Sequence, residues 1–253
     1  MIIQGQKDLK ALLHIGSIVA DCLQMMLSKV EAGISTAELD SMGAAYLKSR
    51  GAVSAPRLMY EFPGETCISI NQEAAHGIPS SKRVIKEGDL VNIDVSAMKD
   101  HYFADTGGTT IVAPASPELK ALCKACKRSL NRAIDAVKAG EKLNVIGKAI
   151  EKEAKKSGFK VIKNLCSHGV GRKLHEEPEL IPSFFKADDN RRLKENMVIT
   201  IEPFLSTGTE LVSDSKDGWA LLNQLGCYSA QFEHSMVITK KKPIILTQPS
   251  SGI

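Results

Sequence analysis

Hydrophobic and polar positions along the chain follow a helical period in some segments and a strand period in others. A first helix is expected over residues 6–29, where apolar residues recur three and four positions apart. A second helix begins at Ser35, because Glu38 three residues later completes a capping box, and it ends at Gly51. The first half of the chain therefore opens with a helix pair.

A second helix pair is expected after residue 115. One helix follows Ser116-Pro117, since serine caps a helix and proline suits its first turn, and it ends at Gly140. The other begins near Asn144 and ends at Gly158. Runs rich in β-branched residues lie between and after the helices, and we expect strands in TCISIN, LVNIDVSAM, YFADTGGTTIV, MVITIEPFL and AQFEHSMVIT.

The two helix pairs are part of a longer repeat. The segments KVEAG and AVKAG end at Gly33 and Gly140, and the helices that follow them end at Gly51 and Gly158, so both pairs of landmarks share one sequence offset. Asp94 and Glu202, each in an apolar strand, are separated by nearly the same offset. We interpret residues 1–253 as one domain of two similar halves, about 1–112 and 113–253, which enclose a site at their seam.

Composition adds few constraints. The 253 residues are 43% hydrophobic and 25% charged, as in an ordinary globular protein, and the net charge of +4 is too small to indicate a nucleic-acid partner. Cys123 and Cys126 form a single CxxC inside a helix-like segment, so we interpret the six cysteines as reduced and not as a zinc site. No apolar run approaches the roughly 20 residues of a membrane span. A cytoplasmic protein is expected.

Two aspartates in apolar strands need an explanation, because a buried carboxylate is costly unless it is paired or binds a metal. A hairpin that turns at Lys99-Asp100 would place Asp94 opposite Asp105, where like charges repel. Lys-Asp is not a favoured two-residue turn, so a bulge that shifts this register is the alternative. In either arrangement both acids lie on one face, and a cation would resolve their repulsion.

Three other residues complete a ligand set. Glu202 and Glu233 each lie in an apolar strand, and His168 precedes glycines that allow a tight turn. Taken singly, each glutamate is as consistent with a hydrogen-bonded structural acid as with a ligand, and a structural role is the favoured interpretation of His168 alone. Together, four carboxylates and one imidazole suit two divalent ions such as Mn, Fe(II), Co or Zn. We interpret three further histidines as surface or structural residues: His14, His101 and His234.

These residues lie in motifs that resemble those of the type I methionine aminopeptidases, in the pita-bread metallopeptidase superfamily. The matching segments run from about Tyr60 to Thr239 and include CISINQEAAHGIP, VNIDVSAMKDHYFADT, SHGVGRKLHEEPEL and ITIEPF. The resemblance implies an α/β (α+β) fold in which two helix pairs cover a central curved antiparallel β-sheet with an internal pseudo-two-fold repeat.

The same resemblance implies a role for each residue. Asp94 would hold one ion, His168 and Glu202 the other, and Asp105 and Glu233 would bridge them. His76 would contact the scissile amide nitrogen and His175 the carbonyl oxygen. The methionine pocket would be formed by Tyr60, Phe62, Cys67 and Trp219, and a monovalent cation, Na or K, would lie near Asn71, Glu73 and Ser229. Ala75 and Leu174 depart from the usual residues of the family and leave the pocket shape open.

The implied reaction is removal of the initiator methionine from nascent proteins and peptides with a small second residue. A metal-bridging hydroxide would attack the first peptide bond, and Glu202 would relay its proton. The expected partners are therefore the N-termini of nascent peptides, with a transient ribosome contact, no specific nucleic acid and no membrane. A monomer is expected.

Two alternatives use the same fold. A prolidase or aminopeptidase P shares the metal ligands but carries a long extra N-terminal domain, whereas here the catalytic pattern begins almost at Met1. A peptide- or RNA-binding module would have lost ligands, and all five are present. Bound metal discriminates between the enzyme and the binding module.

Overall fold

The computed structural model describes residues 1–250, and the helices within them follow the expected order. The second helix begins with the predicted capping box, in which Ser35 and Glu38 bond each other's backbone. A short helix after Ser54 was not predicted, although Ser54 accepts a hydrogen bond from Arg57 N and Pro56 lies in its first turn. The helices are α1 (Gln6–Leu27), α2 (Thr36–Ser49), α3 (Ala55–Tyr60), α4 (Pro117–Ala136) and α5 (Val145–Lys156).

The predicted end of α4 at Gly140 was wrong, because the helix stops at Ala136. Val137 is extended, and the chain beyond it bonds other segments: Ala139 N donates to Thr239 O, and Gly140 N to Leu193 O. These long-range hydrogen bonds replace the last turn that the sequence pattern indicated.

Every strand pair in the described chain is antiparallel. In the first half, β4 (Leu90–Lys99) pairs with β1 (Val53–Ser54), β2 (Cys67–Ile70) and β5 (Tyr102–Ile111). In the second half, a five-stranded sheet has the order β15 (Ile244–Ile245), β14 (His234–Val237), β9 (Val198–Ile201), β7 (Cys166–Gly169) and β8 (Glu176–Pro182).

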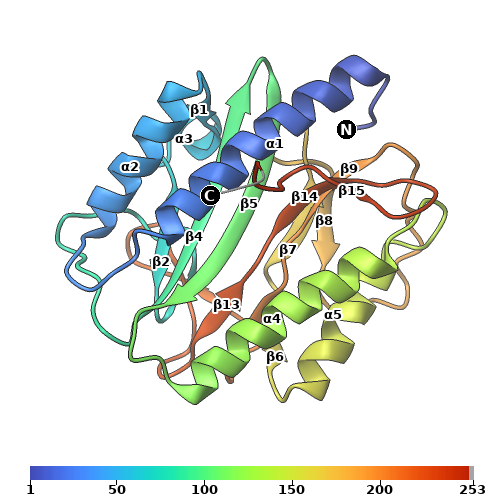
Figure 1. Ribbon diagram of the computed structural model, residues 1–253. Helices are drawn as coiled ribbons and strands as arrows, with labels where there is room; N and C mark the ends of the chain where they lie inside the picture. The colour runs from blue at the N-terminus through green and yellow to red at the C-terminus, as the bar shows by residue number, and fades with distance from the viewer. Residues whose placement is uncertain (251–253) are drawn as a thin grey trace.

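Two smaller sheets complete the described structure. One has the order β13 (Ser229–Gln231), β10 (Phe204–Ser206) and β6 (Lys160–Val161), and the other has β11 (Ser213–Asp214), β12 (Leu221–Leu222) and β3 (Glu73–Ala75). The long helices α1, α2, α4 and α5 lie over one face of the strands, as the pita-bread fold requires (Figure 1).

Each helix pair covers its own hydrophobic core. Residues of α1 and α2 pack with β2, β4 and β5 in one cluster, and residues of α4 and α5 pack with β9, β10 and β14 in another. The halves meet where β5 contacts the second half: Thr106 Oγ1 donates to Glu233 O at 2.8 Å, and Glu233 N donates to Gly107 O at 2.9 Å. The seam therefore runs beside the predicted ligands.

The β4–β5 hairpin differs from the prediction by one residue at its turn. The turn is Asp100-His101, both with positive φ (51° and 64°), as in a type I′ hairpin turn. Asp94 consequently faces Gly107, and Asp105 faces Ser96. Because this register differs from the expected one by two positions, both aspartates remain on one face and are diagonal neighbours.

Two segments expected as single strands are each broken at a glutamate. β9 ends at Ile201 and β10 begins at Phe204, so Glu202-Pro203 lies in the gap. Phe232-Glu233 lies in the corresponding gap between β13 and β14, and the two gaps face each other because His234 pairs with Ile201 and Gln231 with Phe204. Pro203 has no N–H to offer a ladder, which favours the first break.

α1 is more apolar than was expected from the sequence. Among the helices of residues 1–250, only α1 has the length and composition to cross a membrane, a test that core helices of soluble proteins also pass. Half of that stretch is buried inside the protein, where α1 lies across β4 and β5 (Figure 1). We therefore interpret α1 as a core helix.

Candidate metal centre and active site

The structure brings all five predicted ligands together at the seam. One ligand atom from each of Asp105, His168 and Glu233 lies within 4.8 Å of the others. His168 Nε2 is 3.4 Å from Glu202 Oε1 and 3.8 Å from Asp105 Oδ2. Asp94 joins the cluster through Gln231, whose side-chain amide donates to both Asp94 Oδ2 and Glu233 Oε2. Residues that are far apart in sequence thus form one cluster.

Burial dominates the electrostatics of this cluster. Burial raises the pKa of Asp94 to about 6. It also raises the pKa values of Asp105, Glu202 and Glu233 well above their usual range, and repulsion from neighbouring carboxylates adds to the effect at these three. Four carboxylates in one cluster, three of them buried, cannot all be ionised at neutral pH without a compensating charge. The cluster therefore requires either protons or cations.

The donor set fits divalent ions. Asp105 Oδ1 and Glu233 Oε1 are buried and have no hydrogen-bond partner within residues 1–250. His168 Nδ1 lies 2.9 Å from Gly169 O, which makes Nδ1 the donor and leaves the lone pair of Nε2 facing the carboxylates. Burial lowers the pKa of His168 to about 3, with His175 adding to the shift, so the imidazole is neutral and able to bind a metal.

Polar side chains that were not predicted from the sequence hydrogen-bond the predicted ligands. Gln231 Nε2 donates to Glu233 Oε2 at 2.9 Å and to Asp94 Oδ2 at 3.3 Å, and Asn92 Nδ2 donates to Gln231 Oε1 at 2.8 Å. Thr200 Oγ1 lies 3.3 Å from Glu202 Oε1. A signal for them existed: Asn92, Thr200 and Gln231 each lie two residues before an acid, the spacing that places two side chains on the same side of an extended chain.

A cavity of about 540 Å³ opens beside the cluster. The acidic residues Asp94, Asp105 and Glu202 line it together with His168, and the rest of the wall is largely apolar. Phe62 and Trp219 meet edge to face with ring centroids 5.2 Å apart. All four predicted pocket residues line this cavity, together with Leu174 and three residues that no sequence pattern singled out: Leu165, Phe204 and Leu221.

Two more histidines, His76 and His175, reach the same cavity. His175 Nδ1 lies 2.5 Å from the Tyr60 hydroxyl, and its ring centroid is 4.2 Å from that of His168. Burial lowers the pKa of His175 to about 4, with His76 adding to the effect, and burial also lowers the pKa of His76. Both rings are therefore neutral at pH 7 and able to donate or accept a hydrogen bond.

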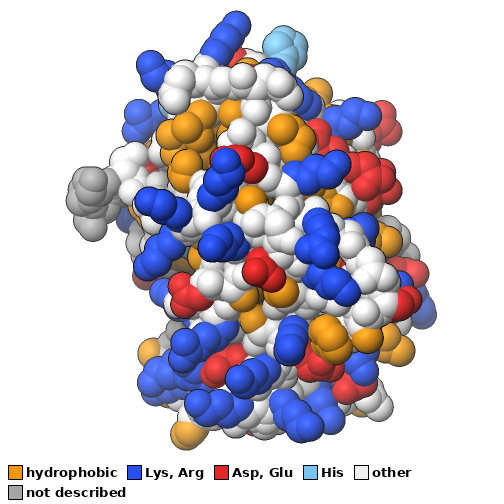
Figure 2. All heavy atoms as spheres, turned by 90° about the vertical axis from the view of Figure 1, so that its right-hand side faces the viewer, with side chains coloured by type: hydrophobic (Ala, Val, Ile, Leu, Met, Phe, Trp, Pro, Cys, Tyr) orange, Lys and Arg blue, Asp and Glu red, His pale blue; other side chains and the backbone are white. Residues whose placement is uncertain are grey.

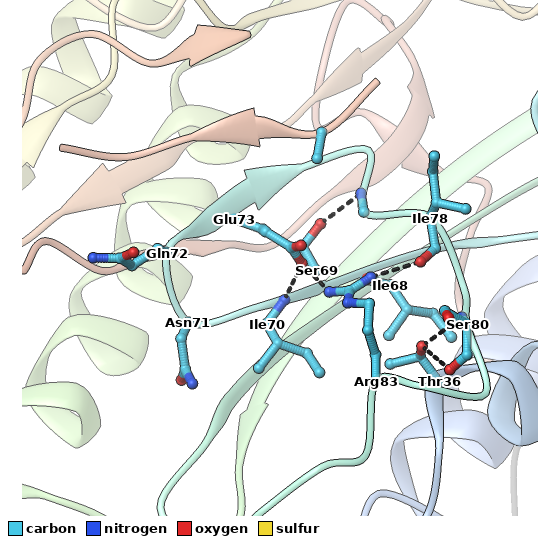
Figure 3. A network of polar contacts seen from close by, with 12 residues as sticks. Thr36, Ile68, Ser69, Ile70, Asn71, Gln72, Glu73, Ile78, Ser80 and Arg83 are labelled. Carbon is cyan, nitrogen blue, oxygen red and sulfur yellow. Dashed lines mark hydrogen bonds and ion pairs between the residues drawn. The ribbon is translucent and has the colours of Figure 1, made fainter. Parts of the chain in front are cut away.

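The residues predicted to surround a monovalent cation make separate contacts. Asn71 Nδ2 donates to Asp89 Oδ1 at 2.7 Å, and Ser229 Oγ accepts from Asn223 Nδ2 at 2.8 Å. The Glu73 carboxylate is paired with the Arg83 guanidinium, and Figure 3 shows Asn71 directed away from Glu73. The monovalent site stays a prediction, and the charge of Glu73 already has a partner within the chain.

Comparison with known proteins assigns the family. Residues 10–240 match the model of metallopeptidase family M24. The chain therefore belongs to the M24 metallopeptidases, a class whose name agrees with the carboxylate and imidazole cluster described above.

Individual relatives place the chain among the methionine aminopeptidases of this family. It is 44% identical to methionine aminopeptidase 2 of Bacillus subtilis over 98% of this chain and 100% of that protein. The crystal structure of methionine aminopeptidase from Thermotoga maritima superposes with a TM-score of 0.94, at 30% identity over 98% of this chain and 100% of that one.

A prolidase shares the fold but matches less completely. The prolidase from Pyrococcus furiosus has a TM-score of 0.77 at 23% identity, and the match covers 98% of this chain but 66% of the prolidase. This similarity supports the pita-bread fold alone. The two relatives described above, which match over their whole length, are methionine aminopeptidases.

Proposed function

We propose that this chain is a metal-dependent aminopeptidase that removes the N-terminal methionine from peptides with a small second residue. The observation that carries the proposal is the cavity itself, where four of the predicted ligands face an apolar wall that includes Phe62 and Trp219, with Glu233 beside them in the same cluster. The names of the whole-length relatives support the same activity. Predicted metal ligands and a pocket suited to a methionine side chain therefore line the same cavity.

The metal ligands we propose are Asp94, Asp105, His168, Glu202 and Glu233. Their oxygen-rich set with one imidazole suits Mn, Fe(II), Co or Zn, and the two buried oxygens without partners support occupation by ions. When bound there, divalent ions would supply Lewis-acid activation of the carbonyl and lower the pKa of the attacking water.

The side chains around the ligands would handle protons and substrate. Glu202 is positioned to accept a proton from the attacking water and pass it to the leaving amine. Neutral His175 can donate a hydrogen bond to the carbonyl oxygen as negative charge develops on it. Neutral His76 would contact the scissile amide nitrogen.

The apolar wall would bind the methionine side chain. Phe62, Cys67 and Trp219 surround space that suits a flexible, polarisable thioether. Tyr60, on the same wall, also contacts His175 and so links the pocket to the reacting groups. A substrate side chain that fills this pocket would bring the first peptide bond to the ligand cluster.

The test is release of free methionine from Met-Ala-Ser by the metal-reconstituted protein. A chelated sample is the control, and an Xaa-Pro peptide is the comparison substrate. We expect methionine release that chelation stops. Cleavage of the Xaa-Pro peptide alone would indicate a prolidase, and the absence of both activities together with the absence of stoichiometric metal would indicate a binding module.

The cellular context follows from the proposed activity. Nascent N-termini are the expected partners, and a cytoplasmic monomer with transient ribosome contact stays our prediction. On the face that includes α4 and α5, Figure 2 shows many Lys and Arg side chains with Asp and Glu side chains among them, and the absence of a specific nucleic-acid partner stays a prediction. The ion pair of Arg128 with Glu153 is an example of this mixing.

A further inference from the structure

His76 adopts a backbone conformation that its surroundings must maintain. Its φ of 56° lies in the left-handed region, which is unfavourable for a residue other than glycine and persists only where neighbouring structure fixes it. His76 directly follows β3 and begins the segment that leads to Arg83. Contacts made by the neighbouring chain must therefore fix the backbone of His76 so that its imidazole reaches the cavity.

Arg83 binds this segment at three points (Figure 3). Its Nη1 donates to Ile78 O at 2.6 Å and to Ile68 O at 3.2 Å, and its Nη2 pairs with Glu73 Oε2. Ile68 belongs to β2, Glu73 begins β3, and Ile78 lies two residues beyond His76. One planar guanidinium thus bonds three parts of the chain around His76: β2, the start of β3 and the residues after His76.

Glu73 and Gly77 complete the attachment to β2. Glu73 Oε2 also accepts a hydrogen bond from Ile70 N at 2.9 Å. Gly77 N donates to Ser69 Oγ at 3.0 Å, and Gly77 O accepts from Ile68 N at 2.9 Å. A Cβ atom at Gly77 would lie 2.2 Å from Ile68 O, so the chain after His76 packs directly on the strand.

The backbone of Arg83 is itself fixed. Arg83 O accepts a hydrogen bond from Thr36 N at 2.9 Å, and Ser80 N donates to Thr36 Oγ1 at 2.9 Å. Thr36 is the first residue of α2. The guanidinium therefore extends from a point anchored on the start of a helix toward the segment that carries His76.

We propose that Arg83 and Glu73 are positioning residues, which hold the His76 imidazole at the reacting bond by fixing residues 68–78 as one unit. This inference rests on the proposed function, because it assumes that His76 contacts the substrate. The ion pair is half-buried, with exposed side-chain fractions of 25% for Arg83 and 20% for Glu73, so water competes with it only in part. Loss of the pair would let the left-handed residue relax.

The principal test is Arg83→Ala, with kinetics of methionine release from Met-Ala-Ser. We expect kcat to fall by about 10- to 100-fold with KM changed by less than about threefold, because small misplacement of a reacting group costs about this much. Added methylguanidinium should restore part of kcat in Arg83→Ala and none in His76→Ala. A purely structural arginine would lower the stability of the protein but leave kcat near the wild-type value at a temperature where the variant is folded.

The matched control is Arg128→Ala. Arg128 Nε donates to Glu153 Oε1 at 2.7 Å between α4 and α5, so this variant also loses an arginine–glutamate pair, outside the residues that line the cavity. It should keep wild-type kcat. The double variant Arg83→Ala/Glu73→Gln leaves no unpaired carboxylate, so it replaces Arg83→Ala if the single variant fails to fold.

A second readout does not depend on activity. The ¹⁵N resonances of the His76 imidazole in metal-free protein should shift in Arg83→Ala and stay unchanged in Arg128→Ala. Wild-type kcat and an unshifted His76 signal in folded Arg83→Ala would overturn the proposal. If wild-type protein releases no methionine, the proposed function fails, and the imidazole resonances still decide whether Arg83 positions His76.

Discussion

The hydroxyl of Tyr60 lies 2.5 Å from Nδ1 of His175. Burial raises the pKa of Tyr60, with Asp105 and Glu179 adding to the effect, so the hydroxyl stays protonated at neutral pH. The contact occupies Nδ1 and leaves Nε2 as the ring nitrogen available to a substrate. Tyr60 was predicted as a wall of the methionine pocket, and the structure adds a contact with one of the proposed catalytic groups.

Tyr60→Phe should lower kcat/KM by about 2- to 12-fold, the equivalent of one net hydrogen bond of about 0.5–1.5 kcal/mol. The ring would still fill the pocket, so the loss reports on His175 and not on methionine packing. Steady-state kinetics with Met-Ala-Ser measures it. Tyr46→Phe on α2 is the control, and an equal loss in both variants would contradict this role.

Glu202→Gln should lower kcat by about 10²- to 10⁴-fold while the protein stays folded, because the amide cannot accept the proton. Single-turnover methionine release and circular dichroism measure the two effects. Glu210→Gln, which removes an exposed partner of Lys163, is the matched control and should be fully active. Near-normal turnover of Glu202→Gln would refute the proton-accepting role.

The cluster of acids could be predicted from sequence because carboxylates in apolar segments leave a signal, and their role as metal ligands stays a prediction. Asp94 and Asp105 lie in apolar strands and Glu233 in an apolar segment between two strands, where a carboxylate without a partner is costly. The position of the hairpin turn left no comparable signal. Neither Asp100 nor His101 is a glycine, yet both take positive φ, so the sequence did not distinguish this turn from one a residue earlier.

Contacts between residues far apart in the chain determined two features that the sequence did not reveal, the strand break at Glu233 and the wall of the cavity. The break at Phe232-Glu233 contains no proline or glycine, and it forms opposite the break at Glu202-Pro203. Trp219 meets Phe62 from the other half of the chain, a contact that no local pattern encodes. The full set of residues that line the cavity could therefore be identified only from the structure.

The duplication of halves 1–112 and 113–253 within one domain stays our prediction. Gly33 and Gly140 adopt similar φ values of 99° and 94°, and Gly51 and Gly158 adopt 66° and 77°. Positive φ at both members of each pair, with the same sequence offset in the two pairs, supports a common origin for the helix pairs.

Gly107→Ala should destabilise the protein by about 1–3 kcal/mol, because a Cβ atom there would lie 2.2 Å from Gln231 Oε1. Gln231 would have to move, and its hydrogen bonds to Glu233 and Asp94 would lengthen or break. Chemical denaturation measures the stability, and metal titration should show weaker binding.

Gly108→Ala is the matched control for this prediction. The added Cβ atom would approach Leu27 Cδ1 at 3.3 Å, the end of a flexible side chain that can shift. Metal affinity should therefore match the wild type. Equal weakening of metal binding in both variants would show that Gln231 does not orient the ligands.

The metal-free protein should lose stability as pH rises from about 6.5 to 8. The pKa values of Asp105, Glu202 and Glu233 are raised well above those of the unfolded chain, so in this range the folded state binds more protons than the unfolded state. Stability falls with pH wherever that holds. Histidines with lowered pKa values, such as His168, act in the opposite direction, but below the unfolded histidine pKa of about 6.5.

Thermal unfolding of chelated protein across this range measures the slope, and adding Mn²⁺ at pH 8 should raise Tm because cations replace the missing protons. Glu202→Gln should flatten the slope, since one of the three carboxyl groups no longer titrates. Because ligand protons compete with the ion, the rise in Tm on adding Mn²⁺ should be smaller at pH 6.5 than at pH 8. A chelated protein that is more stable at pH 8 than at pH 6.5 would show that the buried carboxylates are already compensated within the chain.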